Sequence, residues 1–73
     1  MTEEKKIELL AELFEIDESE IIPEKKLSDL NWDSMNMLGL IALFKSELNK
    51  ELPVSKLRTF ESIKDILEEM RGS

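Results

Sequence analysis

One short polar pair, Asp33-Ser34, stands between a long irregular segment and a strongly apolar run, and it offers the side chains best placed for chemistry. A serine hydroxyl becomes a good nucleophile when a neighbouring base takes its proton, and the chain has no His for that role near neutral pH. Asp followed by Ser at a helix start is also ordinary capping chemistry. In a domain of only 73 residues, any chemistry would have to happen at the surface or on something attached to the chain.

The composition excludes most other kinds of site. There is no Cys, hence no disulfide framework, no thiolate nucleophile and no cysteine-ligated metal. The chain has no glycine-rich phosphate loop and no Asp-x-Asp-x-Asp-Gly calcium loop, so no metal site is expected. A domain of 73 residues buries only about 60% of its unfolded surface, too little to enclose a large active site. We therefore expect a protein that is not an enzyme.

The net charge of −7 belongs to one part of the chain. Residues 1–33 hold eleven acidic and four basic side chains, whereas residues 34–73 hold six of each. This excess disfavours nucleic acid, whose phosphates need Lys and Arg, and favours a partner with a basic surface. The alternative is that it only keeps a small domain soluble. A charged beginning and the lack of a long apolar run predict no signal peptide, no membrane span and a cytoplasmic protein.

The apolar periodicity predicts an all-α fold that begins with two long helices. The first helix is expected from about Glu3 to Phe14, with Thr2 as its cap. Residues 15–33 have no sustained helical period but enough apolar side chains to form a loop packed on the core. A second helix should run from Ser34 to about Lys50.

Two shorter elements should follow. Pro53 ends the second helix, and residues 54–58 have room for one helical turn. Thr59 is expected to cap a last helix with Glu61 in its first turn, and Gly72 to end it. Its apolar stripe is Ile63, Ile66, Leu67 and Met70. The chain should therefore be one domain, residues 1–73, folded as a small four-helix bundle of three main helices and one short one.

The second helix is unusually apolar, since eight of the ten residues from Met35 to Phe44 are hydrophobic and go nearly all the way round it. We expect one face to pack on the core and another to meet a partner. The expected core residues are Leu40, Ile41, Phe44 and Leu48, with Leu10, Phe14, Ile63 and Leu67 from the other helices. The expected docking residues are Met35, Met37, Leu38 and Ala42, although any one Met could instead fill a gap in the core.

The stretch Leu30-Asn31-Trp32-Asp33-Ser34-Met35 resembles the signature of acyl carrier proteins and their peptidyl carrier relatives. In that family Asp-Ser is followed by Leu or Met at the start of the second helix, and the order of elements along this whole chain is similar. The resemblance implies that Ser34, flanked by Asp33, covalently carries 4′-phosphopantetheine donated by coenzyme A. The arm would tether acyl, aminoacyl or peptidyl groups as thioesters. A phosphodiester there suits a helix N-terminus, where free N–H groups and the dipole favour negative charge.

The resemblance also implies partners. These are a phosphopantetheinyl transferase and the enzymes that load, elongate or transfer acyl or aminoacyl cargo in fatty acid or secondary metabolite biosynthesis, acting on a monomeric carrier. The rival interpretation is an unmodified, carrier-like helical interaction module, with the same helices and a chemically silent Ser34.

The sequence departs from the family at several positions. Asn31 stands where Gly is frequent, and Asn tolerates left-handed backbone geometry; Trp32, where a small residue is usual, either shields the root of the arm or plugs the loop. Gly39 and Lys45 replace frequent acidic residues. Gly39 costs about 1 kcal/mol against Ala, which either reflects close approach by another helix or by a partner or is a tolerated accident. Partner binding is therefore expected to rest on Met35, Leu38 and Ala42, with acidic steering from Asp29 and Asp33.

Overall fold

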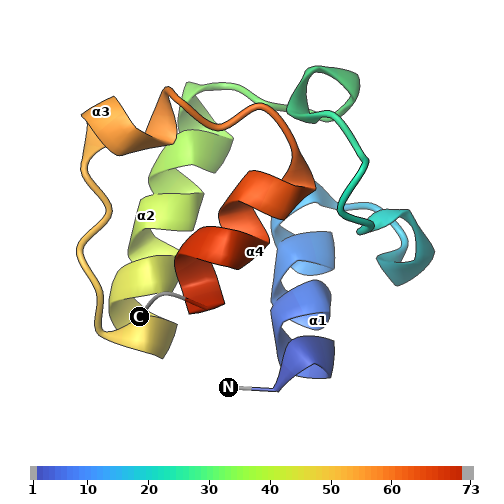
Figure 1. Ribbon diagram of the computed structural model, residues 1–73, viewed down its shortest axis with the longest axis horizontal. Coiled ribbons are helices and arrows are strands. Elements are labelled where there is room, and N and C mark those ends of the chain that lie inside the picture. The colour runs from blue at the N-terminus through green and yellow to red at the C-terminus, as the bar shows by residue number, and fades with distance from the viewer. Residues whose placement is uncertain (1, 72–73) are drawn as a thin grey trace.

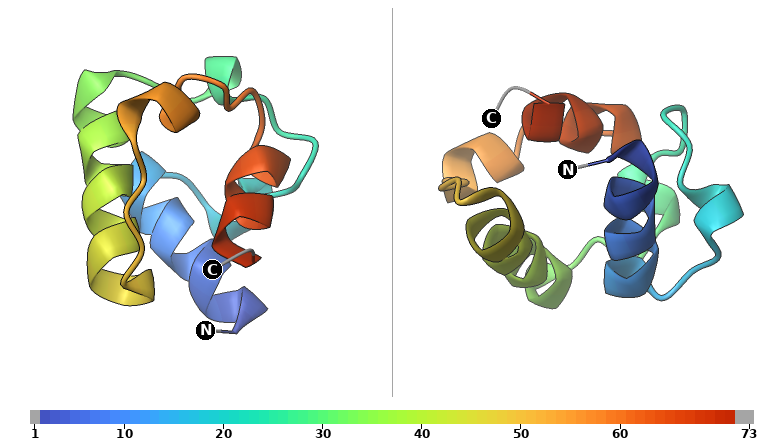
Figure 2. Two further views of the ribbon diagram at one scale, coloured as in Figure 1. Left: turned by 60° about the vertical axis from the view of Figure 1, so that its left-hand side comes forward. Right: turned by 90° about the horizontal axis from the view of Figure 1, so that it is seen from below.

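The computed structural model describes residues 2–71, and this part of the chain is helical and contains no strand. The helices are α1 (Glu3–Phe14), α2 (Ser34–Leu48), α3 (Val54–Leu57) and α4 (Ile63–Arg71). Two single 3₁₀ turns, η1 (Glu18–Glu20) and η2 (Leu27–Asp29), lie in the long connection between α1 and α2. The three longer helices surround a common interior, and α3 lies beside α2 on the way to α4 (Figures 1 and 2). The predicted all-α bundle of three main helices and one short one is confirmed.

Local capping explains where α1 begins and ends. The Thr2 hydroxyl accepts a hydrogen bond from the Lys5 amide at 3.1 Å, and Glu3 and Glu4 place negative charge at the positive end of the helix dipole. At the other end Glu15 adopts a left-handed conformation, with φ 56°, and its N–H reaches back to the helix carbonyls. The predicted span of this helix is confirmed.

The connection between α1 and α2 is held against the start of α4. An isolated antiparallel bridge pairs Lys26 with Ser62. The Leu27 amide donates to the Glu61 carbonyl at 2.9 Å, and the Ile63 amide donates to the Lys25 carbonyl at 2.9 Å. The side chain of Leu27 is buried beneath this bridge. The predicted packed loop thus has fixed backbone partners as well as an apolar anchor.

The bridge also corrects the prediction for the last helix. Thr59 does not cap α4, because its hydroxyl donates to the Lys56 carbonyl at 2.6 Å and so closes α3. Residues 60–62 are held by the bridge, and α4 begins only at Ile63. Asp65 takes over the capping role, accepting from the amides of Glu61 at 2.8 Å and Ser62 at 3.2 Å. The expected stop at Gly72 lies outside the described residues.

The second helix is slightly shorter than predicted. It ends at Leu48 because Asn49 adopts a left-handed conformation, with φ 52°, and its N–H bonds to the Phe44 carbonyl. Pro53 follows four residues later and precedes α3. The helix therefore stops at a left-handed cap, and the proline acts only on the next element.

Most of the expected core is buried. Full burial is found for Leu10, Phe14, Leu40, Phe44 and Ile63. Ile41, Leu48 and Leu67 are only half-buried and pack against the margin of the core. The structure also buries Leu27 of the packed loop, Leu57 of α3, and Ile66 and Met70 of the predicted apolar stripe.

At Gly39 helix α2 lies close to Leu13 of α1. A Cβ at this position would lie 2.6 Å from Cδ1 of Leu13, nearer than real Cβ atoms come. The glycine therefore permits close helix contact, as the first of the two interpretations expected. The obstructing atom is the end of a flexible side chain, so a small shift of Leu13 would admit a methyl group.

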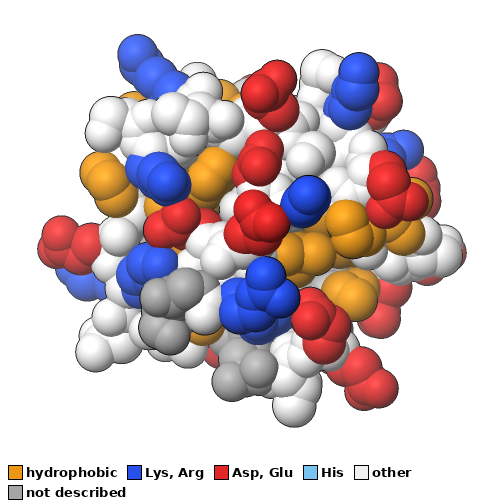
Figure 3. Space-filling view, viewed as in Figure 1, with side chains coloured by type: hydrophobic (Ala, Val, Ile, Leu, Met, Phe, Trp, Pro, Cys, Tyr) orange, Lys and Arg blue, Asp and Glu red, His pale blue; other side chains and the backbone are white. Residues whose placement is uncertain are grey.

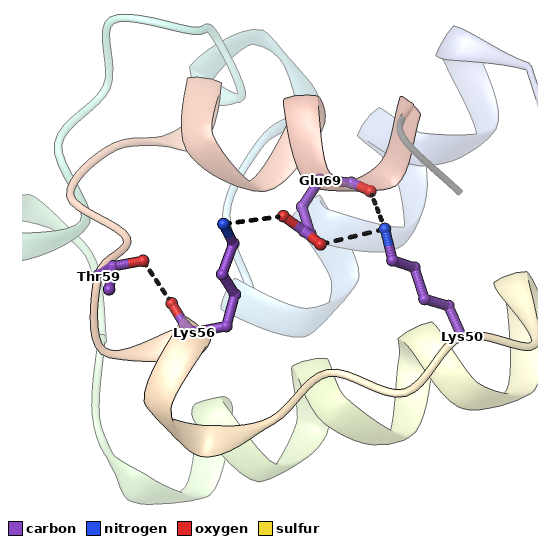
Figure 4. A network of polar contacts seen from close by, with 4 residues as sticks. All are labelled: Lys50, Lys56, Thr59 and Glu69. Carbon is purple, nitrogen blue, oxygen red and sulfur yellow. Dashed lines mark hydrogen bonds and ion pairs between the residues drawn. The ribbon is translucent and has the colours of Figure 1, made fainter.

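The segment that follows the C-terminal end of α2 is joined to α4 by the carboxylate of Glu69 (Figure 4). Lys50 Nζ lies 3.0 Å from Glu69 Oε2 and donates to the Glu69 carbonyl at 2.9 Å, while Lys56 Nζ lies 3.6 Å from Oε1. The hydrogen bond from Lys50, helped by the charges of both lysines and opposed by partial burial, lowers the pKa of Glu69. This network joins the segments before and within α3 to the last helix.

Candidate functional site

Asp33 fixes the start of α2. Its backbone is extended, its carboxylate accepts from the Asn36 amide at 2.9 Å, and its carbonyl accepts from the Met37 amide at 2.9 Å. These are the bonds of an N-cap. The carboxylate of Asp33 is therefore engaged in holding the helix start that presents the next residue.

Ser34 is the first residue of α2, and it is exposed. Among residues 2–71 its hydroxyl has no hydrogen-bond partner, and the same holds for the amides of Ser34 and Met35. A free hydroxyl next to free N–H groups at the positive end of a 15-residue helix suits a phosphodiester linkage. The donor set at this position thus fits a 4′-phosphopantetheine arm.

The loop that leads to Ser34 is tied to α2 by Asn36. Its side-chain amide donates to the Asn31 carbonyl, and the Trp32 amide donates to the Leu30 carbonyl at 2.9 Å, forming a tight turn centred on Asn31. The left-handed geometry considered for Asn31 is not found, because only Glu15 and Asn49 have positive φ among the non-glycine residues 2–71. A three-residue turn of this kind has a negative central φ.

Asn36 was missed as a positioning residue by the sequence analysis. The available signal was a lone amide in the first turn of an otherwise apolar helix. Such a side chain can bond to a nearby carbonyl instead of facing solvent. Its partner lies five residues earlier, in a turn whose shape the sequence pattern does not specify.

Trp32 lies two residues before Ser34 and packs against the core. Its ring is half-buried, with its centroid 6.1 Å from that of Phe14 and the planes tilted by 46°. This is a favourable geometry for an aromatic pair. The ring therefore occupies the position expected of a plug beneath the loop.

The expected docking residues of α2 differ in exposure. Met35 is 78% exposed, Leu38 is 65% exposed, and Ala42 is exposed as well. Met37 was expected on the docking face, but it is half-buried and packs against the core. Its position on the helix turns it toward the other helices, so it does not belong to the exposed face. We call Met35, Leu38 and Ala42 the α2 face.

Charged groups surround this face without forming a metal site. Asp29 is exposed at the end of η2, which lies at the same end of the molecule as the start of α2 (Figure 1). Lys45 and Glu47 are exposed on α2, and neither forms an ion pair within residues 2–71. In this part of the chain no group of three or more His, Cys, Asp or Glu could hold a metal ion. No helix in it is long and apolar enough to cross a membrane.

Charges of both signs are mixed on the face of the molecule shown in Figure 3. On the face shown in Figure 3, carboxylates and Lys or Arg side chains are interspersed, and hydrophobic side chains gather where α1, α4 and the loop meet. This face therefore does not present a continuous acidic surface, despite the net charge of −7. Acidic steering toward a basic partner would have to come from local groups such as Asp29.

The comparison with known families agrees with this geometry. A family model described as a phosphopantetheine attachment site matches residues 7–70, which is nearly the whole chain. The match includes the loop, the Asp33-Ser34 pair, the α2 face and α4. Members of this family carry covalently attached 4′-phosphopantetheine. The chain belongs to the phosphopantetheine attachment-site family, the family of acyl and peptidyl carrier proteins.

Proposed function

We propose that Ser34 is the residue that carries 4′-phosphopantetheine and that the chain holds acyl or aminoacyl groups as thioesters for partner enzymes. The observation that supports this most directly is the unbonded, exposed Ser34 hydroxyl at the start of α2, within a family match over residues 7–70. Other hydroxyls lack this combination. Ser46, for example, lies in the last turn of α2 and donates to the Leu43 carbonyl at 3.5 Å.

The residues around Ser34 would hold the root of the arm. Asp33 keeps the helix start in place, and the free amides of Ser34 and Met35 offer donors to phosphate oxygens. The arm, when attached, supplies the thiol that forms the thioester; the chain itself has no Cys. The protein would then act as a non-catalytic, monomeric carrier in the cytoplasm.

Partner enzymes would meet the α2 face. Two of its three residues are large exposed hydrophobics next to the attachment point, which is the arrangement of an interaction site. Helix α2 offers a single carboxylate, Glu47, so contact there would be mainly apolar, with Asp29 steering from the loop. A carrier of this kind fits a dedicated biosynthetic or peptidyl pathway at least as well as housekeeping fatty acid synthesis.

The loading reaction tests the proposal. The purified chain is incubated with coenzyme A and a broad-specificity phosphopantetheinyl transferase, and its intact mass is measured. We expect the mass to rise by one phosphopantetheine in the wild type and to remain unchanged in Ser34→Ala. An unchanged wild-type mass, with a known carrier loaded in a parallel reaction, would instead favour the unmodified interaction module.

A further inference from the structure

A groove with an apolar floor lies between α1 and α4, and we call it the α1–α4 groove. Its volume is about 370 Å³, which is in the range of small-ligand sites, roughly 300–1,000 Å³. The floor consists of Ile7 of α1, Leu67 of α4 and Ile21 from the loop between α1 and α2. Ile21 is buried and the other two are half-buried. The first half of α1, which forms one wall, lies at the opposite end of the molecule from the beginning of α2 (Figures 1 and 2).

The walls of the groove are held in place without any ligand. The Lys64 amide donates to the Pro23 carbonyl at 3.1 Å, and both residues line the groove. The Ile21 amide donates to the Glu18 carbonyl at 3.0 Å, which fixes the loop on the other side of the floor. A site whose walls are already fixed does not have to be ordered when a ligand enters. The groove is therefore preformed.

Lys6 is the unusual residue of this groove. It is only 9% exposed, and its ammonium has no hydrogen-bond or ion-pair partner within residues 2–71. Every fully buried side-chain nitrogen or oxygen in this part of the chain has a partner, so the ammonium of Lys6 must reach the surface at the groove it lines. It also lies near the N-terminal end of α1, where the helix dipole disfavours a cation. The fold thus provides no anion for this largely buried charge, whose desolvation is unfavourable unless it is paired.

The other charges of the groove leave a small positive excess. Lys64 and Arg71 line it on the α4 side, both exposed and neither forming an ion pair within residues 2–71. Glu3 and Glu68 line it as well. Three cations and two carboxylates give a local charge of +1 in a chain whose net charge is −7. This balance suits a monoanion, whereas a phosphate dianion would exceed the positive charge and face both carboxylates.

We infer that the α1–α4 groove binds a free organic monocarboxylate with a short hydrocarbon body. The carboxylate pairs with the ammonium of Lys6, and the hydrocarbon lies on the apolar floor. From Lys64 to Arg71 the helix rises by about 10 Å, so the body is short. A protein partner would need about 800 Å² of contact surface, which a floor of three largely buried side chains does not supply. The groove shares no lining residue with Ser34 or the α2 face, so this ligand is separate from any tethered cargo.

Octanoate is the probe, with octanol and octyltrimethylammonium as its neutral and cationic counterparts. Each is titrated into the full chain, with and without phosphopantetheine, and amide NMR spectra are recorded. Octanoate should shift the signals of Ile7, Ile21 and Leu67 with a dissociation constant of roughly 0.1–1 mM in both samples. Octanol should bind about tenfold more weakly, and octyltrimethylammonium should not bind. Octanol binding as tightly as octanoate, or octanoate shifts that avoid these three residues, would overturn the inference.

The neighbouring lysine gives the matched control. Lys6→Met keeps an apolar stem of similar length and removes the charge, so octanoate should bind about tenfold more weakly while octanol binding stays unchanged. Lys5→Met makes the same change at an exposed site of α1 outside the groove and should bind octanoate like the wild type. Equal losses in the two variants would reduce the effect to overall charge and overturn the role of Lys6. The three-probe comparison on the wild type decides independently of either variant's folding, and none of these outcomes bears on loading at Ser34.

Discussion

The two faces of α2 have the same kind of sequence and opposite surroundings. Leu38 and Leu40 are two residues apart, yet Leu38 is 65% exposed and Leu40 is fully buried. Met35, at the start of the helix, is 78% exposed, whereas Phe44 is fully buried. An apolar side chain left in water contributes little to folding. One face of this hydrophobic helix therefore serves the fold, and our proposal assigns the exposed face to a partner.

The largest expected effect is the difference in unfolding free energy between alanine variants of the two leucines. Leu40→Ala removes a fully buried side chain and should cost about 2–5 kcal/mol of unfolding free energy, a large share of the stability of a domain this small. Leu38→Ala should stay within about 0.5 kcal/mol of the wild type. Urea unfolding of both variants measures this. Equal losses would show that the α2 face is part of the core.

Leu38 should matter for partner binding, although it matters little for stability. Leu38→Ala should weaken binding to a phosphopantetheinyl transferase roughly three- to tenfold, mainly through faster dissociation, because contact area is lost without a change of charge. Glu47→Gln, the change of the only acidic residue of α2, should alter binding little. A loss for Glu47→Gln as large as that for Leu38→Ala, in surface plasmon resonance, would restore an acidic mode of recognition.

A smaller effect concerns the Glu69 network at the far end of α2. The lysine partners of Glu69 lower its pKa in the folded state. The carboxylate therefore contributes its full stabilisation above the unfolded-state pKa, about 4.3. This stabilisation is lost as the pH falls through the lower folded-state pKa. Glu69→Gln should therefore cost about 0.5–1 kcal/mol at pH 7, discounted because Lys56 is half exposed, and this cost should shrink as the pH is lowered below about 4.3.

The neighbouring carboxylate offers a control for that measurement. Glu68 is exposed on the same helix and forms no ion pair within residues 2–71. Glu68→Gln removes one carboxylate from α4 without touching either lysine, so thermal unfolding at pH 7 should show a change in stability within about 0.5 kcal/mol. A pH-independent cost of Glu69→Gln would mean that the network acts through packing and not through charge.

The smallest effect is on the rate of association. Asp29→Asn removes one exposed charge near the attachment site, so association with a basic partner should slow by only a few-fold, and its dependence on salt should weaken. The dissociation rate should not change. Stopped-flow measurements over a range of salt concentrations test this, and a change confined to dissociation would place Asp29 inside the contact instead.

Much of the fold could be predicted because its signals are local. Thr2 and Asp33 are capping residues, and their hydrogen bonds are made within three residues. Leu10 and Phe14 lie four residues apart on α1, a spacing set by the period of the helix, and both are buried in the core. The attachment-site family could be recognised for the same reason, since its signature is a short contiguous stretch.

The features that were predicted wrongly or missed depend on distant partners. Thr59 looks like a helix cap, but the Lys26–Ser62 bridge delays α4 until Ile63. Met37 differs from Met35 only in which way the helix turns it relative to the other helices. The bridge joins two residues 36 positions apart, which no local pattern relates.

The most direct test is to locate the added group. After loading, the chain is digested and the modified peptide is sequenced by tandem mass spectrometry, with the melting temperature of Ser34→Ala measured in parallel. We predict that phosphopantetheine is found on Ser34 alone, and that Ser34→Ala stays unloaded yet melts close to the wild type, because Asp33 still caps α2. Modification of Ser28 or Ser46 in place of Ser34 would contradict the assignment of the start of α2 as the attachment site.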